Sequence, residues 1–571
     1  MPMNLRPQPF RSLLPAIFTL LIVAGCSKKS TDTEATGLVA GQAMVVSAHP
    51  LASAVGRDIM KKGGNAVDAS IAVQFALAVV YPAAGNLGGG GFMLARFADG
   101  HLDALDYREK APDAASTNMY LGETGEPIAE KSFRGHLASG VPGTVAGLFE
   151  AHGKYGNLQW SDLVQPSIDL AVKGFPLTKR EAEGLNSIQE DLRKYNTVLP
   201  DHLLRDRWNE GDTVRQTELG QTLERIRDGG RSGFYEGKTA EDILAEMQRG
   251  KGIITREDLK NYTAIWREPI TMAYKDYKVI SMPPPSSGGI LLFQLLRAME
   301  LQPISDWGWN SVKTAHYIIE AERRAYADRA FYLGDPDFIT IPVKQLTDPT
   351  YIDARMSDID PEKATPSDQV REGKVPKESE QTTHLSVVDP QGNAVAVTTT
   401  LNAGYGSMVV VSGSGFFLND EMDDFSVKPG APNIYGAIGG EANKIEPGKR
   451  MLSSMTPTIV ERDGKLFMVV GTPGGTTIIT SVYQTILNVV EHGMSMQEAV
   501  NSPRFHSQWA PDLVFMEPGA FKKEDSTKLS GMGHIFKQRG PIGRVDAIRV
   551  MKDGRLEGGA DPRGDDKAEG Y

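Results

Sequence analysis

Residues 381–401 read QTTHLSVVDPQGNAVAVTTTL and carry the clearest secondary-structure signal in the chain. Two runs rich in β-branched and apolar residues, 385–388 and 394–401, flank the segment 389–393, which contains Asp, Pro, Gly and Asn. Runs of this composition favour strands, and the residues between them favour a tight turn. The pattern therefore predicts a β-hairpin.

The register of this hairpin brings two threonines together. If the turn is centred on Gln391, antiparallel pairing places Thr382 opposite Thr400. A slip of one residue would make Leu401 the partner instead. The segment before the hairpin, 361–380, is polar, charged and proline-bearing, so we expect it to be exposed and mobile.

The rest of the chain predicts mixed α and β structure without an internal repeat. Four glycines, 88–91, precede an apolar run and lack the Gly-Lys-Ser/Thr ending of a phosphate loop, so they predict a turn and not a nucleotide site. Other predicted elements are helices at 52–62, through 71–80, across most of 145–261 and at 290–300, a strand at 466–470, and a helix whose apolar face includes Ile478, Val482, Ile486 and Val489.

Composition indicates one large globular unit. The 571 residues are 40% hydrophobic and 23% charged and include 60 glycines, which suits a compact enzyme with many turns. Sixty-one Lys and Arg against 72 Asp and Glu give a net charge of −11, and no long basic run is present. Nucleic acid is therefore not an expected partner.

The N-terminus has the layout of an export signal. Arg6 and Arg11 precede an apolar run, 13–23, that is too short to remain as a membrane-spanning helix. Ala24-Gly25-Cys26 resembles a bacterial lipobox, which predicts a leader at 1–25, lipid on Cys26 and a location in the periplasm or cell envelope. An ordinary signal peptide or a short membrane anchor is the alternative. Cys26 is the only cysteine, so an intramolecular disulfide or cysteine metal cluster is excluded.

Several ordered motifs resemble one known family. The chain around the hairpin resembles the processing site of γ-glutamyltransferases, which belong to the N-terminal-nucleophile hydrolases, and the similarity covers about residues 40 to 571. The further motifs are Asp106-Tyr107-Arg108-Glu109, Gly140-Val141-Pro142-Gly143, Pro285-Ser286-Ser287-Gly288-Gly289, 419–425 (NDEMDDF), 450–458 (RMLSSMTPT) and Gly471-Thr472-Pro473-Gly474-Gly475.

The resemblance implies a fold and a maturation step. The fold would be α+β, a four-layer αββα sandwich of two antiparallel sheets between helical layers. The chain would cleave itself between Gln381 and Thr382 into a large subunit, 26–381, and a small catalytic subunit, 382–571. Both subunits would form one globular heterodimer, because their strands share one core.

Thr382 is the expected nucleophile. A threonine hydroxyl is a poor nucleophile until a base removes its proton, and a free α-amine with a pKa near ~7.7 to 8.0 can do so at physiological pH. Cleavage before Thr382 would supply that amine. By resemblance, Thr400 orients Thr382, and the N–H groups of Gly474 and Gly475 stabilise an oxyanion. A strand threonine or a turn glycine without a catalytic role would have the same local sequence.

The resemblance also implies a site for a free amino acid end. The carboxylate would be held by Arg108, Ser453 and Ser454, since arginine binds carboxylates in a bidentate manner. The ammonium group would be held by Asn402, Glu421 and Asp424. Tyr435 would lie on a lid loop or simply pack within it. Without the motifs, Arg108 and the acidic residues would be interpreted as surface charges.

The implied reaction is acyl transfer from glutathione or a similar γ-glutamyl compound to water or to an amino acid or peptide amine. A γ-glutamyl ester of Thr382 would be the intermediate, and no metal or organic cofactor is expected. Two alternatives stay open: a cephalosporin acylase-like enzyme with the same nucleophile, and a lipid-anchored solute-binding protein without catalysis.

Overall fold

The computed structural model describes residue 1 and residues 36–370, 382–428 and 440–571. The described residues do not include most of the predicted leader, Cys26, residues 371–380, Gln381 or Tyr435. Contacts separate Met1–Thr33 from one large compact unit, Glu34–Tyr571. That unit carries the secondary structure and the predicted site.

Two seven-stranded sheets form the centre of the large unit, and within each of them every neighbouring pair is antiparallel. In order across the first sheet, the strands are β1 (Leu38–Ala40), β18 (Leu556–Gly559), β17 (Asp546–Val550), β13 (Lys465–Gly471), β12 (Thr458–Arg462), β9 (Tyr277–Ser281) and β8 (Ile270–Tyr274). The second sheet consists of β19 (Lys567–Gly570), β2 (Met44–Ser47), β10 (Thr382–Val388), β11 (Ala394–Thr400), β3 (Gly90–Arg96), β4 (Leu102–Asp106) and β7 (Ile265–Arg267). Each sheet thus combines strands from before and after residue 382.

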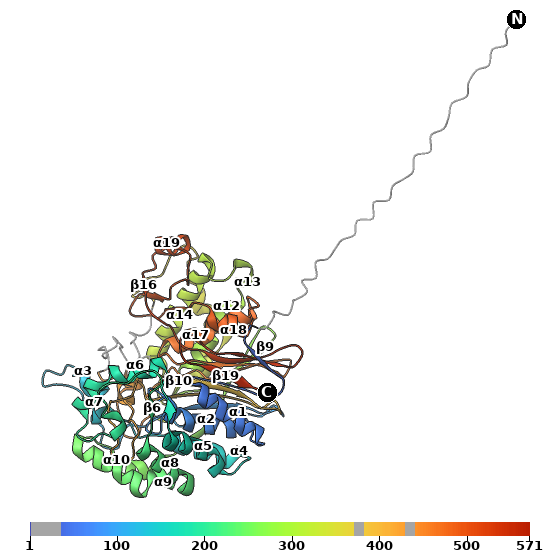
Figure 1. Ribbon diagram of the computed structural model, residues 1–571. Helices are drawn as coiled ribbons and strands as arrows, with labels where there is room; N and C mark the ends of the chain where they lie inside the picture. Colours follow the sequence, from blue (N-terminus) through green and yellow to red (C-terminus); the bar gives the residue numbers. More distant parts are fainter. Residues whose placement is uncertain (2–35, 371–381, 429–439) are drawn as a thin grey trace. The chain divides into compact units, whose positions relative to one another are not determined.

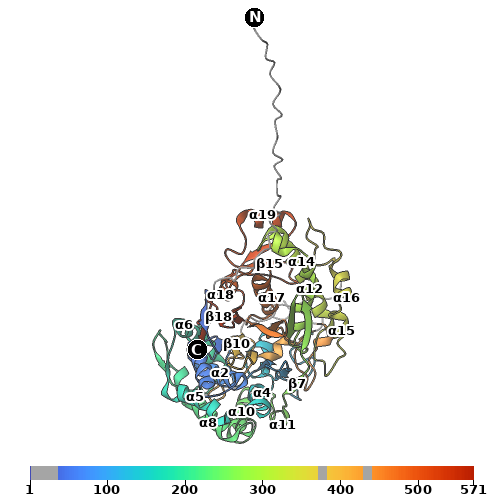
Figure 2. The same cartoon turned by 90° about the vertical axis from the view of Figure 1, so that its right-hand side faces the viewer.

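Helices cover the two outer faces of the stacked sheets, as Figures 1 and 2 show. On the side of the second sheet lie α1 (Pro50–Lys61), α2 (Ala66–Val80), α4 (Thr144–Tyr155), α5 (Trp160–Lys173) and α8 (Thr217–Gly229). On the side of the first sheet lie α12 (Gly288–Glu300), α14 (Val312–Tyr332), α17 (Thr477–Val490) and α18 (Met496–Asn501). A third buried cluster, including Val46, Leu94, Ile459 and Ile548, fills the space between the sheets. The predicted four-layer αββα sandwich is confirmed.

The remaining elements are short and complete the periphery. Helices and 3₁₀ turns are α3 (Ala129–Phe133), η1 (His136–Ala138), α6 (Lys179–Ser187), α7 (Gln189–Tyr195), η2 (Asp201–Leu203), α9 (Ser232–Tyr235), α10 (Gly237–Gly250), α11 (Arg256–Asn261), α13 (Ile304–Trp307), α15 (Val343–Leu346), α16 (Pro349–Met356), η3 (Glu421–Asp424), η4 (Glu441–Asn443) and α19 (Lys523–Gly531). Short strands are β5 (Phe175–Pro176), β6 (Thr213–Val214), β14 (Phe505–Ser507), β15 (Val514–Met516) and β16 (Phe536–Gln538). The prediction of mainly helices across 145–261 is confirmed.

The hairpin of β10 and β11 has the register centred on Gln391. Thr382 pairs with Thr400 and Val388 with Ala394, so the alternative partner Leu401 is wrong. The first strand begins at Thr382, three residues earlier than its apolar run, because β11 supplies hydrogen-bonding partners along the whole length. Both strands are buried throughout, since each has sheet neighbours on both edges and packed layers on both faces.

A polar layer lies between the two sheets beside the start of β10. The His384 ring bonds to the Thr398 hydroxyl at 2.9 Å and to the Ser386 hydroxyl at 3.1 Å. The Ser386 hydroxyl in turn donates to the Asp546 carbonyl on the opposite sheet at 3.0 Å. Burial lowers the pKa of His384 to about 3, so the imidazole is neutral and acts as a structural hydrogen-bonding group.

The glycine run contributes to β3 and not only to a turn. The strand begins at Gly90, so the last two glycines of the run belong to it. A Cβ on Gly90 would lie 2.5 Å from the Tyr107 carbonyl, and one on Gly91 would lie 2.6 Å from the Thr398 carbonyl. Glycine is therefore required by the close approach of the neighbouring backbones.

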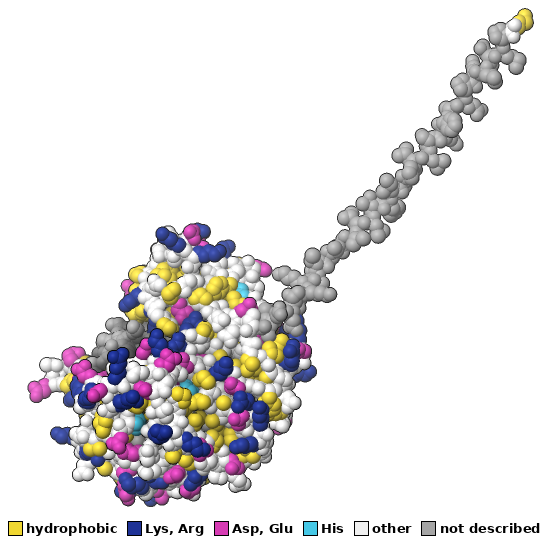
Figure 3. Space-filling view, viewed as in Figure 1, with side chains coloured by type: hydrophobic (Ala, Val, Ile, Leu, Met, Phe, Trp, Pro, Cys, Tyr) yellow, Lys and Arg dark blue, Asp and Glu magenta, His cyan; other side chains and the backbone are white. Residues whose placement is uncertain are grey.

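Lys and Arg side chains are interspersed with Asp and Glu on the face shown in Figure 3. No large patch of one sign dominates that face. Of the helices described here, none combines the length and apolar character needed to cross a bilayer.

Candidate functional site

Thr382 is the first residue of β10, and Thr400 is the last residue of the adjacent strand β11. The side chains of both threonines point into the space between the two sheets. The Thr382 hydroxyl donates to the Thr400 hydroxyl across 3.4 Å, and Thr400 Oγ1 also accepts the Asn402 N–H at 2.7 Å. The Thr382 residue is 6% exposed and Thr400 is 2% exposed. The reacting hydroxyl predicted from the sequence is thus oriented by a fixed neighbour and still reaches the surface of a recess.

That recess has a volume of about 20 Å³ and gathers side chains from distant parts of the chain. Its lining contains most of the site residues predicted from the sequence. They are Arg108, Thr382, Thr400, Asn402, Glu421, Asp424, Ser453, Ser454 and Gly475, joined by Met455 and Ile478. Gly474 immediately precedes this lining in the chain.

Gly474 and Gly475 form the turn between β13 and α17. Their φ angles are 137° and 57°, which a residue with a side chain rarely adopts. The carbonyl groups of Gly474 and Gly475 accept the first N–H groups of the helix, from Thr477 and Ile478. Within the described part of the chain, the N–H groups of the two glycines donate no hydrogen bond, so they are available to a developing oxyanion.

Arg108 follows β4 and forms the centre of a buried charge cluster. Its guanidinium donates to Glu421 and Asp424, which η3 presents, and to the Met451 and Leu452 carbonyls, each at 3.3 Å. Arg108 and Glu421 are each 1% exposed. The acidic run is therefore a buried counter-charge, and its interpretation as a solvated surface is wrong.

The carboxylates of the cluster hold the Arg108 guanidinium in its charged form. Burial opposes the charge on Arg108, but Glu421 and Asp424 outweigh it and raise the pKa of the guanidinium. Burial raises the pKa of the adjacent Glu109 carboxyl to about 7, against the opposing effect of Arg108. The sequence assigned Arg108 and the two carboxylates to opposite ends of a substrate, and the structure shows that they also bind each other.

The loop with Ser453 and Ser454 is fixed by the neighbouring segment at Ser287. The Ser453 N–H donates to the Pro285 carbonyl at 3.0 Å, and the Ser453 carbonyl accepts the Ser287 N–H at 2.7 Å and the Ser287 hydroxyl at 2.8 Å. Both serines of the recess are 2% exposed. The two serines thus line the recess together with Arg108.

Arg329 on α14 is a site-supporting residue that sequence reasoning missed. Its guanidinium donates to the Ser454 hydroxyl at 3.0 Å and to the Ser287 hydroxyl at 2.9 Å. Arg329 is 2% exposed. It lies in a charged helical stretch that resembles a solvated surface, so the sequence carried no signal for this role.

Asn402 is held in a left-handed conformation, with a φ of 73°. Its side-chain amide donates to the Asp420 carbonyl at 3.0 Å, and the following N–H, of Ala403, donates to the Asp420 carboxylate at 2.8 Å. Burial raises the pKa of Asp420 well above its usual value. Asp420 therefore connects the loop after β11 to the acidic segment at Glu421.

Three predicted site residues, Cys26, Gln381 and Tyr435, lie outside the described residues. Within residues 36–370, 382–428 and 440–571, no group of three or more His, Cys, Asp or Glu side chains has the arrangement of a metal site.

Sequence comparison gives the family of this chain. The family profile described as Gamma-glutamyltranspeptidase matches residues 52–571. The chain belongs to the γ-glutamyltranspeptidase family. A relative from Escherichia coli strain K12, called glutathione hydrolase proenzyme, is 47% identical over 543 residues, which cover 93% of this chain and 92% of the relative.

Solved structures agree with membership of the γ-glutamyltranspeptidase family. A cephalosporin acylase from Bacillus halodurans matches with a TM-score of 0.83 and 27% identity, covering 95% of this chain and 98% of its own. A γ-glutamyltranspeptidase from Helicobacter pylori matches with a TM-score of 0.55 and 44% identity, covering 57% of this chain and 93% of its own. The fold alone therefore does not separate the two activities.

The buried charge cluster predicts an asymmetric effect on stability. Arg108→Met leaves Glu421 and Asp424 without their shared cation, and we expect the free energy of unfolding to fall by about 3–5 kcal/mol. Adding Glu421→Gln should recover part of that loss, because one buried negative charge is removed. Urea unfolding of both variants and the wild type measures the effect. A loss below about 1 kcal/mol in Arg108→Met would show that the cluster does not exist in solution.

Proposed function

We propose that this protein is a self-cleaving γ-glutamyltransferase and glutathione hydrolase with Thr382 as its nucleophile. The observation that carries the proposal is the recess itself. Thr382, Thr400 and the glycine turn meet there with a cation, two carboxylates and two serines. This combination suits acyl transfer from a substrate that ends in a free amino acid.

Maturation begins at the peptide bond before Thr382. The Thr382 oxygen attacks the Gln381 carbonyl carbon, its proton passes to the Thr382 nitrogen, and the carbon–nitrogen bond breaks to leave an ester. Water then hydrolyses the ester and produces a Gln381 carboxylate and a free Thr382 amine. That amine, with a pKa near ~7.7 to 8.0 in an unperturbed chain, is the base that the hydroxyl otherwise lacks.

Catalysis repeats the same attack on a γ-glutamyl amide. The Thr382 amine accepts the hydroxyl proton as the oxygen adds to the γ-carbonyl, and the N–H groups of Gly474 and Gly475 stabilise the oxyanion. Collapse releases the amine of the leaving group, which takes up the proton, and leaves a γ-glutamyl ester. Water or an acceptor amine then attacks the ester, returns the proton to Thr382 and yields glutamate or a new γ-glutamyl compound.

The charge cluster would select a zwitterionic substrate by exchange of partners. An incoming α-carboxylate would take the guanidinium of Arg108 and the hydroxyl groups of Ser453 and Ser454. The α-ammonium group would take the carboxylates that Arg108 releases, Glu421 and Asp424, with support from Asn402. Because each charge finds a new opposite charge, no group is left buried and unpaired.

Two alternatives compete with this proposal. A cephalosporin acylase-like activity is favoured by the match to the Bacillus halodurans structure, but the identity there is 27%, against 47% to the glutathione hydrolase proenzyme. A solute-binding protein would need the charge cluster without the adjacent nucleophile and glycine turn. The proposed enzyme uses all of these parts.

Export and lipid attachment belong to the same proposal and rest on the sequence. The leader at 1–25 and lipid on Cys26 would place the enzyme in the periplasm or cell envelope, anchored only through the lipid. The mature chain would then consist of subunits 26–381 and 382–571. Both sheets contain strands of both subunits, so cleavage would leave the subunits joined.

Thr382→Ala should abolish cleavage, because the attacking hydroxyl is absent. Thr383→Ala is the matched control. Because the Thr383 side chain lies on the face of β10 opposite to that of Thr382, this variant should be cleaved normally. Gel electrophoresis and N-terminal sequencing should show a fragment that begins Thr-Thr-His-Leu-Ser in the wild type. Cleavage of the Thr382 variant, or a different new N-terminus, would refute the mechanism.

The enzyme should cleave a γ-glutamyl anilide at least ~10³-fold faster than a glutaryl anilide, which lacks the α-amine and α-carboxylate. Arg329→Lys should lower the ratio of the two cleavage rates, mainly by raising KM for the γ-glutamyl substrate. The reason is that the Ser454 hydroxyl loses the guanidinium that fixes its position. Arg324→Lys is the control: Arg324 is similarly buried on α14 but pairs with Glu320 and Asp358. Similar wild-type rates on both anilides would favour the acylase alternative.

Wild-type protein should partition into detergent and incorporate a palmitate analogue in cells, whereas Cys26→Ser should do neither. The reason is that the thiol accepts the lipid and acyl chains provide the anchoring. Ser27→Ala serves as the neighbouring control and should still be labelled. Equal labelling of wild type and Cys26→Ser would exclude lipid attachment at this residue.

A further inference from the structure

Two buried threonine hydroxyls fix the carbonyl groups of the turn between β13 and α17. The Thr472 hydroxyl donates to the Pro473 carbonyl at 2.8 Å, and the Thr477 hydroxyl donates to the Gly474 carbonyl at 2.6 Å. Thr472 is 0% exposed and Thr477 is 3% exposed. Because both side chains are buried, bulk water does not compete for these hydrogen bonds, and the two carbonyl groups keep one direction.

These carbonyl groups belong to the same peptide units as the proposed oxyanion donors. In a planar trans peptide, the carbonyl of one residue and the N–H of the next form one rigid unit and point in opposite directions. The Pro473 carbonyl therefore sets the direction of the Gly474 N–H, and the Gly474 carbonyl sets the direction of the Gly475 N–H. Glycine has more backbone freedom than any other residue, so the two hydroxyls supply a restraint that the turn itself lacks.

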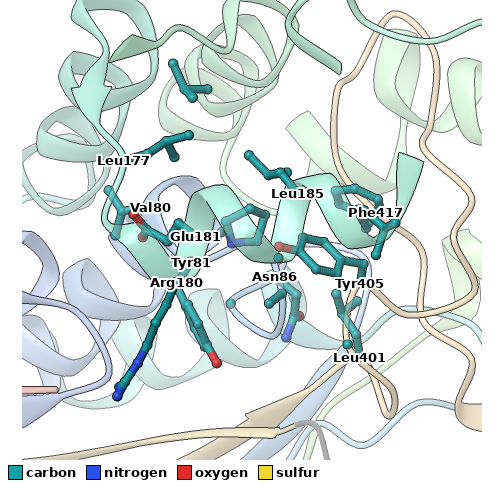
Figure 4. A pocket seen from close by; sticks show the side chains of 18 of the residues that line it. Val80, Tyr81, Asn86, Leu177, Arg180, Glu181, Leu185, Leu401, Tyr405 and Phe417 are labelled. Atoms are coloured by element: carbon teal, nitrogen blue, oxygen red, sulfur yellow. The ribbon is translucent and has the colours of Figure 1, made fainter. Parts of the chain in front are cut away.

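The Thr472 hydroxyl is itself oriented by the chain before β17. Its oxygen accepts the Arg544 N–H at 2.6 Å, so its single proton is directed to the Pro473 carbonyl. The Arg544 guanidinium holds that backbone in place by donating to the Ala48 carbonyl at 2.7 Å and to the Tyr81 hydroxyl at 2.8 Å. Figure 4 shows Tyr81 in the wall of a separate cavity of about 400 Å³, which Arg544 also lines. Because neither residue lines the catalytic recess, a substrate there leaves this support in place.

The Thr477 hydroxyl is held directly against the turn by the start of α17. A Cβ on Gly474 would lie 2.5 Å from the Thr477 oxygen, so the two residues are in close contact. The Thr477 N–H also donates to the Gly474 carbonyl, at 3.1 Å. The Thr476 carbonyl accepts the hydroxyl of Tyr326, which belongs to α14. The first residues of α17 are therefore fixed to a second helix, and with them the position of the Thr477 side chain.

We propose that Thr472 and Thr477 are positioning residues for the oxyanion site of the reaction proposed above. Each hydroxyl holds one carbonyl of the turn, so that the N–H groups of Gly474 and Gly475 both face the oxyanion that forms when Thr382 adds to the acyl carbon. Donors fixed in advance need no reorganisation during the reaction. Neither threonine lines the recess, so both act through the glycine turn and not on the substrate. The inference rests on the proposed function, because this oxyanion forms only in acyl transfer.

Thr472→Val and Thr477→Val test the proposal, since each removes a hydroxyl and keeps the branched shape of the side chain. Loss of a whole oxyanion donor costs about 10²- to 10³-fold in kcat, and these variants only misdirect one, so kcat for a γ-glutamyl anilide should fall about 10- to 100-fold. KM should change less than about twofold, because the oxyanion is absent from the bound substrate. Thr485→Val is the matched control and should keep kcat: Thr485 is buried on α17, and its hydroxyl donates to the Ser481 carbonyl at 2.8 Å.

Two further measurements separate positioning from a general loss of structure. Thr472→Ser and Thr477→Ser retain the hydroxyl, so kcat per cleaved chain, counted by mass spectrometry, should stay within about threefold of the wild type. The second probe is the analogue of glutamate in which a boronic acid replaces the γ-carboxyl group. The Thr382 oxygen adds to its boron, the proton passes to the Thr382 amine, and a tetrahedral anion forms. Its Ki should rise about 10- to 100-fold in the valine variants, while the Ki of glutamate, which forms no adduct, stays unchanged.

Wild-type kcat in both valine variants, or an equal loss in the valine and serine variants, would overturn the positioning role. A loss in Thr485→Val as large as that in Thr477→Val would also overturn it, because any buried hydroxyl of α17 would then have the same effect. A rise in KM and in the Ki of glutamate that accounts for the whole effect would assign the two threonines to substrate binding instead. Failure of the proposed function is recognised separately: the wild type would cleave no γ-glutamyl anilide, or Thr382→Ala would remain active, and the positioning role would fall with it.

Discussion

The rest of the site depends on the antiparallel pairing of β10 on both of its edges. One edge bonds to β11, which places Thr400 beside Thr382, and the other bonds to β2 from the start of the chain. A strand held on two edges cannot leave the sheet when the bond before it is cut. Thr382, the proposed nucleophile, would therefore become a chain terminus without losing its position, and the groups near it would keep their geometry.

The interior of the molecule tolerates an unusual amount of polarity near this strand. His384 bonds across the space between the sheets, and Arg108 lies buried with two carboxylates. Such groups are costly when isolated but acceptable when each has a partner. Under the proposed function the same partners would have a second use, since a zwitterionic substrate would exchange with them. The small volume of the recess is consistent with such an exchange.

Residues that do not belong to the sequence motifs of the site also hold the recess in place. Arg329 reaches Ser454 and Ser287 from α14, whose charged residues are mostly buried against other charged residues. Asn86 reaches the Thr400 carbonyl from the turn after α2. Residues from both proposed subunits thus fix one another, so the site and the core are products of the same assembly.

The sequence by itself determined the hairpin, because local turn residues and β-branched runs indicate two strands and a turn without help from the rest of the chain. The choice between Thr400 and Leu401 as the partner of Thr382 was made only in the folded sheet. The sequence also determined the family, because motifs can be recognised by their residues and their order along the chain without knowledge of where they lie in the fold. Tertiary structure alone decided that Arg108 binds Glu421 and Asp424, that β3 begins within the glycine run, and that α14 buries Arg329. Each of these depends on contacts between residues far apart in the chain, and periodicity and composition carry no record of such contacts.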